Sequence, residues 1–296
     1  MRFGVREICN VVFKAADTRR IGTKVFTKGT PVIYFDSLKT STMEQATTTV
    51  YAQGGRGNTR LVAWEGEKTL TFTMEDALIS EMGLAILSGA NLFEAGEGEH
   101  LNGNTLLVHV TETVPNGVVT KTATTNNKVA AYALELNDNG EVTGAPFEVT
   151  IDTDKKVTAK ETGEGKPTIE ANKIYLVDYY TEVKEKAYQI DIEPQSFGGN
   201  FYIEADTLFR DTKGTDHAAQ FIIPNGKIQS NFTLTMASSG DPSTFTFTVD
   251  AFPGYVNGDL TKKVMATIQI LEEDIDIITN NDAAGDIDDT EETVAG

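Results

Sequence analysis

Apolar and polar residues alternate in short runs along most of the chain, the pattern typical of antiparallel strands. It is clearest in residues 60–93, where apolar side chains fall at every second position on both sides of a Glu-Gly-Glu-Lys sequence at 65–68. Those side chains are Leu61, Ala63, Leu70, Phe72 and Met74. Alternation on both sides of a turn sequence predicts a β-hairpin with one apolar face.

A short helix is predicted directly after this hairpin. Apolar residues recur at spacings of three and four from Ala77 to Ile86. Glu75 and Asp76 suit the first helical turn, because acidic side chains interact favourably with the N-terminal end of the helix dipole. Gly89 suits the C-terminal end. We therefore expect an amphipathic helix that covers the apolar face of the hairpin.

A second predicted hairpin lies in residues 230–252, with a turn at 238–242. Its alternating apolar residues are Phe232, Leu234 and Met236, then Phe245, Phe247 and Val249. Further strand-like runs lie at residues 7–15, 30–35, 104–114, 131–136, 147–151, 172–180, 187–192, 199–210, 220–224 and 264–271. The sequence thus predicts a mainly β fold, an antiparallel β-sandwich or barrel with a short flanking α-helix.

Turn signals and composition divide the chain. Residues 116–184 are rich in Thr, Lys, Asn and Gly and contain several short strand-like runs, so we interpret them as an inserted β-rich subdomain. Residues 1–115 and 185–271 then form the sandwich. Residues 272–296 lose large aromatic side chains and gain acidic ones, and we expect a mobile acidic tail.

The stretch at residues 36–60 is rich in Thr and Gly and poor in large apolar groups. Two interpretations stay open at this point. It is either a long binding loop that becomes ordered on contact, or a pair of polar strands joined at a Gly-Gly turn. Arg56 and Arg60 lie here without the strand, glycine loop and helix of a phosphate-binding motif, so phosphate binding is not predicted.

Charge limits the function classes. The 296 residues carry 44 acidic and 25 basic side chains, a net charge of −19. Ten acidic residues lie in the last 25 positions, and without them the net charge is −9. This argues against a conventional nucleic-acid-binding surface, which places cations against phosphates. No apolar run approaches the roughly 20 residues of a membrane helix, and no secretory signal is evident, so we expect synthesis in a cytoplasm and no membrane insertion.

Catalytic chemistry is not predicted. The single cysteine, Cys9, suits a small buried side chain, and His109 suits a strand position. His100 and His217 complete the histidines, and no nucleophile, metal-ligand or nucleotide motif is present. The acidic clusters at 274–276 and 286–289 lack the spacing of a calcium loop. We expect no cofactor, no metal site and no enzyme activity; a β-sandwich hydrolase is the weakest of three function classes.

Two stretches resemble the tail tube, or major tail, proteins of tailed bacteriophages. The first is WEGEKTLTFTMEDALIS followed by EMGLAILSGA, and the second is SNFTLTMASSGDPSTFTFTVDAF. The resemblance covers residues 1–115 and 185–271. It implies six copies packed in a ring, and rings stacked into a conduit for DNA. An acidic, Thr-rich channel would repel phosphate, and strand edges would be closed by neighbouring copies.

The resemblance also implies partners and contact residues. The expected partners are other copies of the chain, other tail proteins such as sheath, terminator or baseplate components, and DNA in transient passage. The expected location is the virion tail, after assembly in the host cytoplasm. Predicted inter-ring contacts are Thr40, Met43, Tyr51 and Arg56, and predicted ring-wall residues are Leu70, Phe72, Phe232, Leu234, Phe245 and Phe247. The alternative is another virion or cell-surface module, such as a capsid decoration protein or an Ig-like adhesin.

Overall fold

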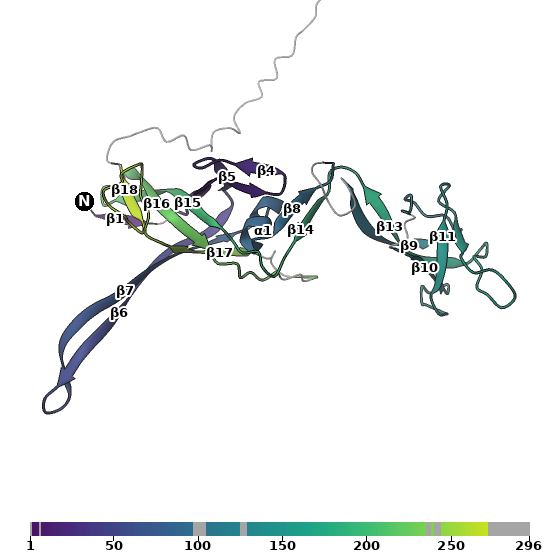
Figure 1. The fold of residues 1–296 in the computed structure, drawn as a ribbon, viewed down its shortest axis with the longest axis horizontal. Coiled ribbons are helices and arrows are strands. Elements are labelled where there is room, and N and C mark those ends of the chain that lie inside the picture. Colours follow the sequence, from purple (N-terminus) through teal and green to yellow (C-terminus); the bar gives the residue numbers. More distant parts are fainter. Residues whose placement is uncertain are drawn as a thin grey trace, which may run out of the picture. The chain divides into compact units, whose positions relative to one another are not determined.

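The fold was obtained as a computed structural model (Figure 1), which describes residues 2–5, 7–96, 105–124, 129–234, 238–239 and 244–271. The chain divides into two compact units. Unit 1 comprises Met1–Arg19, Val25–Gly89 and Gln195–Gly296, and unit 2 comprises Arg20–Lys24 and Ala90–Pro194.

Unit 1 is built on a nine-stranded antiparallel sheet. Its main path runs β5-β2-β15-β16-β17-β7-β6, with β1 beside β15 and β18 beside β16. The strands are β1 (Phe3–Val5), β2 (Asn10–Ala15), β5 (Pro31–Phe35), β6 (Leu38–Gly54), β7 (Thr59–Asp76), β15 (Asn200–Asp211), β16 (Asp216–Ile228), β17 (Phe245–Ala251) and β18 (Thr267–Ile270). Separately, β3 (Arg19–Ile21) pairs with β4 (Lys24–Phe26).

Aromatic side chains from distant strands of this sheet meet in one core. Phe13 lies 5.3 Å from Phe35 and 5.5 Å from Phe201, and Phe35 lies 4.9 Å from Phe247, measured between ring centroids. All four are at most 3% exposed. Such pairs contribute about 0.5–1.5 kcal/mol each beyond area burial. Because β5 and β17 lie four places apart on the sheet path, the contact requires the sheet to curve over its own core. The predicted antiparallel β fold is confirmed, without closure into a barrel.

The predicted helix exists but begins later than expected. Helix α1 spans Glu81–Ser88, and the Ser80 side chain caps it by accepting a hydrogen bond from the Gly83 N–H at 3.0 Å. The assignment of Glu75 and Asp76 to the first turn is wrong. Both belong to β7, where the buried Asp76 carboxylate accepts hydrogen bonds from Ser37 and from the Leu78 N–H. Gly89 ends the helix in the left-handed conformation, as predicted.

The first predicted hairpin has the right strands but the wrong turn. β7 runs without a break through residues 65–68, and the chain reverses at residues 55–58 instead. Of the two interpretations of residues 36–60, the paired strands are therefore correct and the loop is wrong. Gly55 and Gly57 take positive φ angles of 78° and 97° in this turn, which glycine adopts without strain.

The second predicted hairpin is largely wrong. Residues 231–234, including Phe232 and Leu234, are not in a strand, and residues 235–237 and 240–243 lie outside the described part. Only its second half forms a strand, β17, which pairs with β7 and β16. Residues 231–234 alternate as a strand does, but they only connect β16 to the segment before β17. The position that a hairpin partner would take beside β17 is occupied by the distant β7.

Unit 2 contains a five-stranded antiparallel sheet in the order β12-β11-β10-β13-β9, and a separate pair, β8 with β14. The strands are β8 (Asn91–Glu94), β9 (Leu106–Val114), β10 (Ala131–Leu136), β11 (Phe147–Ile151), β12 (Val157–Ala159), β13 (Ile174–Val183) and β14 (Tyr188–Asp191). Its core is centred on Tyr175, Val177 and Tyr179. The predicted insert, residues 116–184, falls inside this unit, which also takes in residues assigned to the sandwich. The predicted acidic tail, 272–296, lies outside the described residues.

A buried tyrosine fixes β13 to β9 in unit 2. The Tyr179 hydroxyl donates to the Glu112 carboxylate at 2.7 Å, and Thr120 donates to the same carboxylate through its N–H and hydroxyl. Burial, then the bond to Glu112, raises the pKa of Tyr179 from 10.0 to about 12. Burial opposes ionisation of Glu112, but the Thr120 and Tyr179 bonds hold the pKa of its carboxyl below the usual value.

The raised pKa predicts an alkaline weakening of unit 2. Below pH 10 the phenol is neutral in both states and its stabilisation is complete; from about pH 10 to about 12 the unfolded state ionises first and stability falls. Tyr179→Phe should lower the free energy of unfolding by about 1 kcal/mol at pH 7 and should remove this part of the pH dependence. Urea unfolding followed by circular dichroism at pH 7 to 11.5 measures both.

Tyr175→Phe is the matched control, because the Tyr175 hydroxyl accepts a hydrogen bond from the Glu170 N–H and donates one to the Thr168 carbonyl, both backbone groups. An unchanged alkaline slope in Tyr179→Phe would contradict the assignment.

Candidate assembly surfaces

The most prominent feature of unit 1 is an arm formed by residues 44–69 of β6, β7 and their turn (Figure 1). Every residue of the arm is exposed except Ala52 and Gly54, which are half-buried. The strand pairing satisfies the arm's inward backbone groups, but no second layer covers its side chains. A two-stranded hairpin is at best marginally stable alone in water. The arm therefore depends on its anchorage in the sheet or on contact with another surface.

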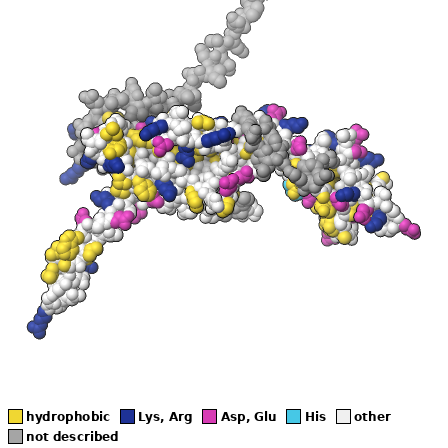
Figure 2. All heavy atoms as spheres, in the orientation of Figure 1, with side chains coloured by type: hydrophobic (Ala, Val, Ile, Leu, Met, Phe, Trp, Pro, Cys, Tyr) yellow, Lys and Arg dark blue, Asp and Glu magenta, His cyan; other side chains and the backbone are white. Residues whose placement is uncertain are grey.

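Large apolar side chains lie together on one face of the arm. Val50 pairs with Trp64 and Ala52 with Val62, so these four point to the same side. The exposed fractions are 64% for Val50, 49% for Val62 and 56% for Trp64. We call these three side chains the arm face. Figure 2 shows hydrophobic side chains gathered on the arm, with cationic side chains at its tip. Exposed apolar strands of this kind are interaction sites or aggregation hazards.

A β-bulge aligns the arm face. Thr47 pairs with Lys68 and Thr49 with Glu65, so one step more is taken on β7 than on β6. Thr48 accepts a hydrogen bond from the Glu67 N–H at 2.9 Å, and a Cβ on Gly66 would lie 2.6 Å from the Thr48 hydroxyl oxygen. An extra residue in one strand inverts which side chains point to each face beyond it. The bulge thereby brings Trp64 to the same face as Val50.

The distal arm is also cationic. Residues 45–64 contain Arg56 and Arg60 and no acidic residue, in a protein of net charge −19. The Arg60 guanidinium lies 4.1 Å from the centroid of the Tyr51 ring. An exposed cation–π contact of this kind is worth about 0.5–1 kcal/mol. Arg56 lies at the turn. The arm thus combines apolar and positive groups.

A second apolar surface lies where β1 and β18 extend the sheet. Here the local order is β1-β15-β16-β18. Phe209 forms the floor, 6.2 Å from Phe3 and 5.9 Å from Phe221 between ring centroids. Val5 pairs with Phe209, Ile268 with Phe221, and Ile270 with Ala219. We name the exposed and half-buried members the end strip: Phe3, Val5, Phe221, Ile268 and Ile270.

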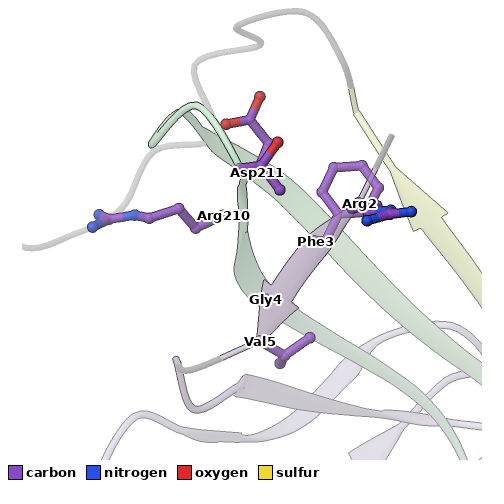
Figure 3. Close-up of a pocket in the computed structure, with 7 residues that line it drawn as sticks. Arg2, Phe3, Gly4, Val5, Arg210 and Asp211 are labelled. Carbon is purple, nitrogen blue, oxygen red and sulfur yellow. The ribbon is translucent and has the colours of Figure 1, made fainter.

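A shallow pocket adjoins the end strip (Figure 3). Its volume is about 400 Å³, and Arg2, Phe3, Gly4, Val5, Arg210, Asp211 and Thr212 line it. Arg210 forms a two-point ion pair with Asp216, at 2.6 Å for each bond. The β1 side of the wall combines the apolar Phe3 and Val5 with the cation Arg2, and the other side carries Arg210 paired with Asp216.

The predicted contact residues fall into different places. Tyr51 and Arg56 lie on the arm, Met43 is half-buried at its base, and the exposed Thr40 hydroxyl donates to Glu75 at 3.3 Å. Three of the predicted ring-wall residues are buried in the core of unit 1: Phe72 at 2%, Phe245 at 7% and Phe247 at 0% exposure. Leu70 and Phe232 are half-buried, and Leu234 is 44% exposed. They do not form one surface.

Sequence reasoning missed the arm face and the end strip. The signal for the arm face was present, since Val62 and Trp64 alternate with Leu61 and Ala63. The misplaced turn at 65–68 concealed it. The end strip joins residues more than 200 positions apart, which no local pattern reveals.

The predicted histidine and cysteine environments hold. Cys9 is 6% exposed, and burial is the main cause that raises the pKa of its thiol, which opposes reactivity. His109 lies in β9 with its Nε2 2.6 Å from Asp178. Within the described ranges, no three metal-ligating side chains cluster, and no helix is long and apolar enough to cross a membrane.

The fold and these surfaces define a β-sheet protein whose exposed features suit contact with other macromolecules. A family model described as the YomU/Tube protein family matches residues 16–268. The chain belongs to this phage tube protein family, and the resemblance to tail tube proteins is confirmed. Family membership implies a place in the virion tail. No curated protein matches the chain.

The bulge predicts a local effect of Thr48→Val. This change keeps the side-chain volume but removes the acceptor of the Glu67 N–H, at a cost of about 0.5–1 kcal/mol for an exposed hydrogen bond. Amide exchange of Glu67 and its neighbours should accelerate, while exchange in the core strands stays unchanged. Hydrogen exchange with mass spectrometry measures this. Thr47→Val, on the opposite face of β6, is the control and should leave arm exchange as in the wild type; equal exchange in both variants would contradict the role of Thr48.

Proposed function

We propose that this protein is the structural subunit of a phage tail tube, in which copies form rings, hexameric by the family resemblance, that stack into a conduit for DNA. A structural rather than catalytic role follows from this proposal. The family match supports the tube assignment at the coarse level. The arm is the observation that carries the finer proposal.

An arm of 26 residues with an exposed apolar face needs a partner surface. At about 25 cal/mol per Å² of apolar area, burying a Trp and two Val side chains contributes several kcal/mol to association. A tube offers such burial in every copy, because each arm can reach a neighbouring ring. At about 3.3 Å per residue, a strand of 12 residues extends about 40 Å, enough to leave its own subunit.

The sheet of unit 1 also has two ends that suit lateral contacts. In the described residues, its path begins at β5 and ends at β6. Strands at the ends of a sheet present unpaired backbone donors and acceptors. Pairing between different edges of neighbouring copies is a heterologous contact, which closes into a ring when the rotation allows it. Ring formation is consistent with this geometry.

One face of the sheet has the composition expected of a DNA channel. Along β7 and β17, Thr73 pairs with Thr248 and Thr71 with Asp250. On β15, Asp206 accepts a hydrogen bond from Gln220, and Glu204 forms an ion pair with Lys14. Carboxylates and neutral hydroxyls offer DNA phosphates little to bind, and the net charge of −19 adds repulsion. DNA would then pass without adhering.

The remaining partners follow from a place in the tail. Assembly in the host cytoplasm, and contacts of the terminal rings with sheath, terminator or baseplate components, belong to this proposal. Under the alternative, a capsid decoration protein or Ig-like adhesin, the chain would work without long stacks of its own copies.

Shortening the arm tests the proposal. Replacing residues 48–67 by Asn-Gly joins the paired residues Thr47 and Lys68 by a hairpin turn and leaves every core residue in place. The variant should keep the thermal transition of the wild-type body but fail to form fast-sedimenting assemblies. Analytical ultracentrifugation of both proteins at high concentration is the measurement.

Truncation after Leu271 is the control, because it removes ten acidic residues and leaves the arm intact. We expect it to assemble like the full chain. Assembly of the arm-shortened protein, or a wild type that remains monomeric, would contradict the proposal. Trp64 gives a second readout: as the only tryptophan, its emission should shift to the blue when the wild type assembles.

A further inference from the structure

The end strip is a surface without a covering layer in the described part of unit 1. Val5 is 63%, Ile268 54% and Ile270 37% exposed, beside the buried floor residue Phe209. The strip crosses four strands. Its width is therefore three inter-strand spacings, or about 14 Å. A two-stranded ribbon, whose strands lie about 4.8 Å apart, fits within that width. Two sheets that pack face to face leave about 10 Å between them, which side chains from both fill.

The arm face provides a matching surface. Val50, Val62 and Trp64 project from a two-stranded ribbon, and a large aromatic beside β-branched residues is the composition of an interface centre.

A chain does not cover its own end strip with its own arm. Both belong to unit 1, and the arm projects away from β1 and β18 (Figure 1). Donor and acceptor are therefore different surfaces of the same chain. A contact between two different surfaces can repeat from copy to copy, as a ring or a stack requires.

We infer that the arm of one copy docks on the end strip of another, with Trp64, Val50 and Val62 against Ile268, Ile270 and Phe221. This inference rests on the proposed tube function and names the surface that receives the arm. Its distinctive consequence is that one residue on β18 controls where the arm of a different copy binds.

The test uses Trp64 as a reporter in mixed samples. The donor is the full chain with Ile268→Asp, which has an intact arm and a disrupted strip. The acceptor is the arm-shortened chain, which has an intact strip and no tryptophan, since residues 48–67 include Trp64. Ile268 is 54% exposed, so its replacement does not empty the core. All emission therefore comes from the donor arm.

Mixing donor and acceptor above the concentration at which the wild type assembles should shift Trp64 emission to the blue. An acceptor that also carries Ile268→Asp should abolish the shift. An acceptor with Leu260→Asp, a matched change at a residue 72% exposed elsewhere in unit 1, should preserve it. Sedimentation of the mixture should show the donor bound to the acceptor.

Three results would overturn the inference. They are no shift with any acceptor, an equal shift with the intact and the Ile268→Asp acceptor, and a shift that appears only when the acceptor is truncated after Leu271. The last would assign the strip to the chain's own C-terminal segment. Each leaves the tube proposal standing if the wild type assembles and its own Trp64 emission shifts. A monomeric wild type with unshifted emission would instead refute the tube proposal itself.

Discussion

Hydrophobic burial in the sheet of unit 1 is the interaction on which the rest of the structure depends. It anchors one end of β6 and β7, the two longest strands, and the other end of this pair extends beyond the core as the arm. Near the core, Phe72 and Met74 on β7 are at most 2% exposed. Beyond Leu70 the same strand has no covering layer, although its pairing with β6 continues to the turn. Backbone hydrogen bonds hold the arm in register, but they do not remove Trp64 or Val62 from water. Hydrophobic burial for these side chains has to come from another surface.

This division explains how one chain supplies both a stable subunit and a contact element. The aromatic core around Phe13, Phe35 and Phe247 stabilises the body independently of the arm. The bulge at Gly66 then determines which residues the arm presents. Unit 2 has its own buried core around Tyr175 and Tyr179. The exposed arm face and end strip are therefore not part of either buried core.

Much of the fold followed from local patterns, and the failures have definite causes. The strands at 131–136 and 147–151 were predicted to the residue, because clear alternation ends at turn residues there. The turn at 65–68 was wrong because a β-bulge uses Gly and polar residues as a turn does. The start of the helix was wrong because Asp76 is held by Ser37, a contact between residues 39 positions apart. The end strip depends on pairing of Phe3 with Asp211, which alternation cannot encode.

Negative-stain electron microscopy of the purified protein at high concentration tests the central claim most directly. A tube subunit with an uncovered arm should form rings or hollow tubes, with a channel of about 20 Å or more to pass duplex DNA. Isolated particles at every concentration, with no rings or tubes, would contradict the account. That result would favour a decoration or adhesin module instead.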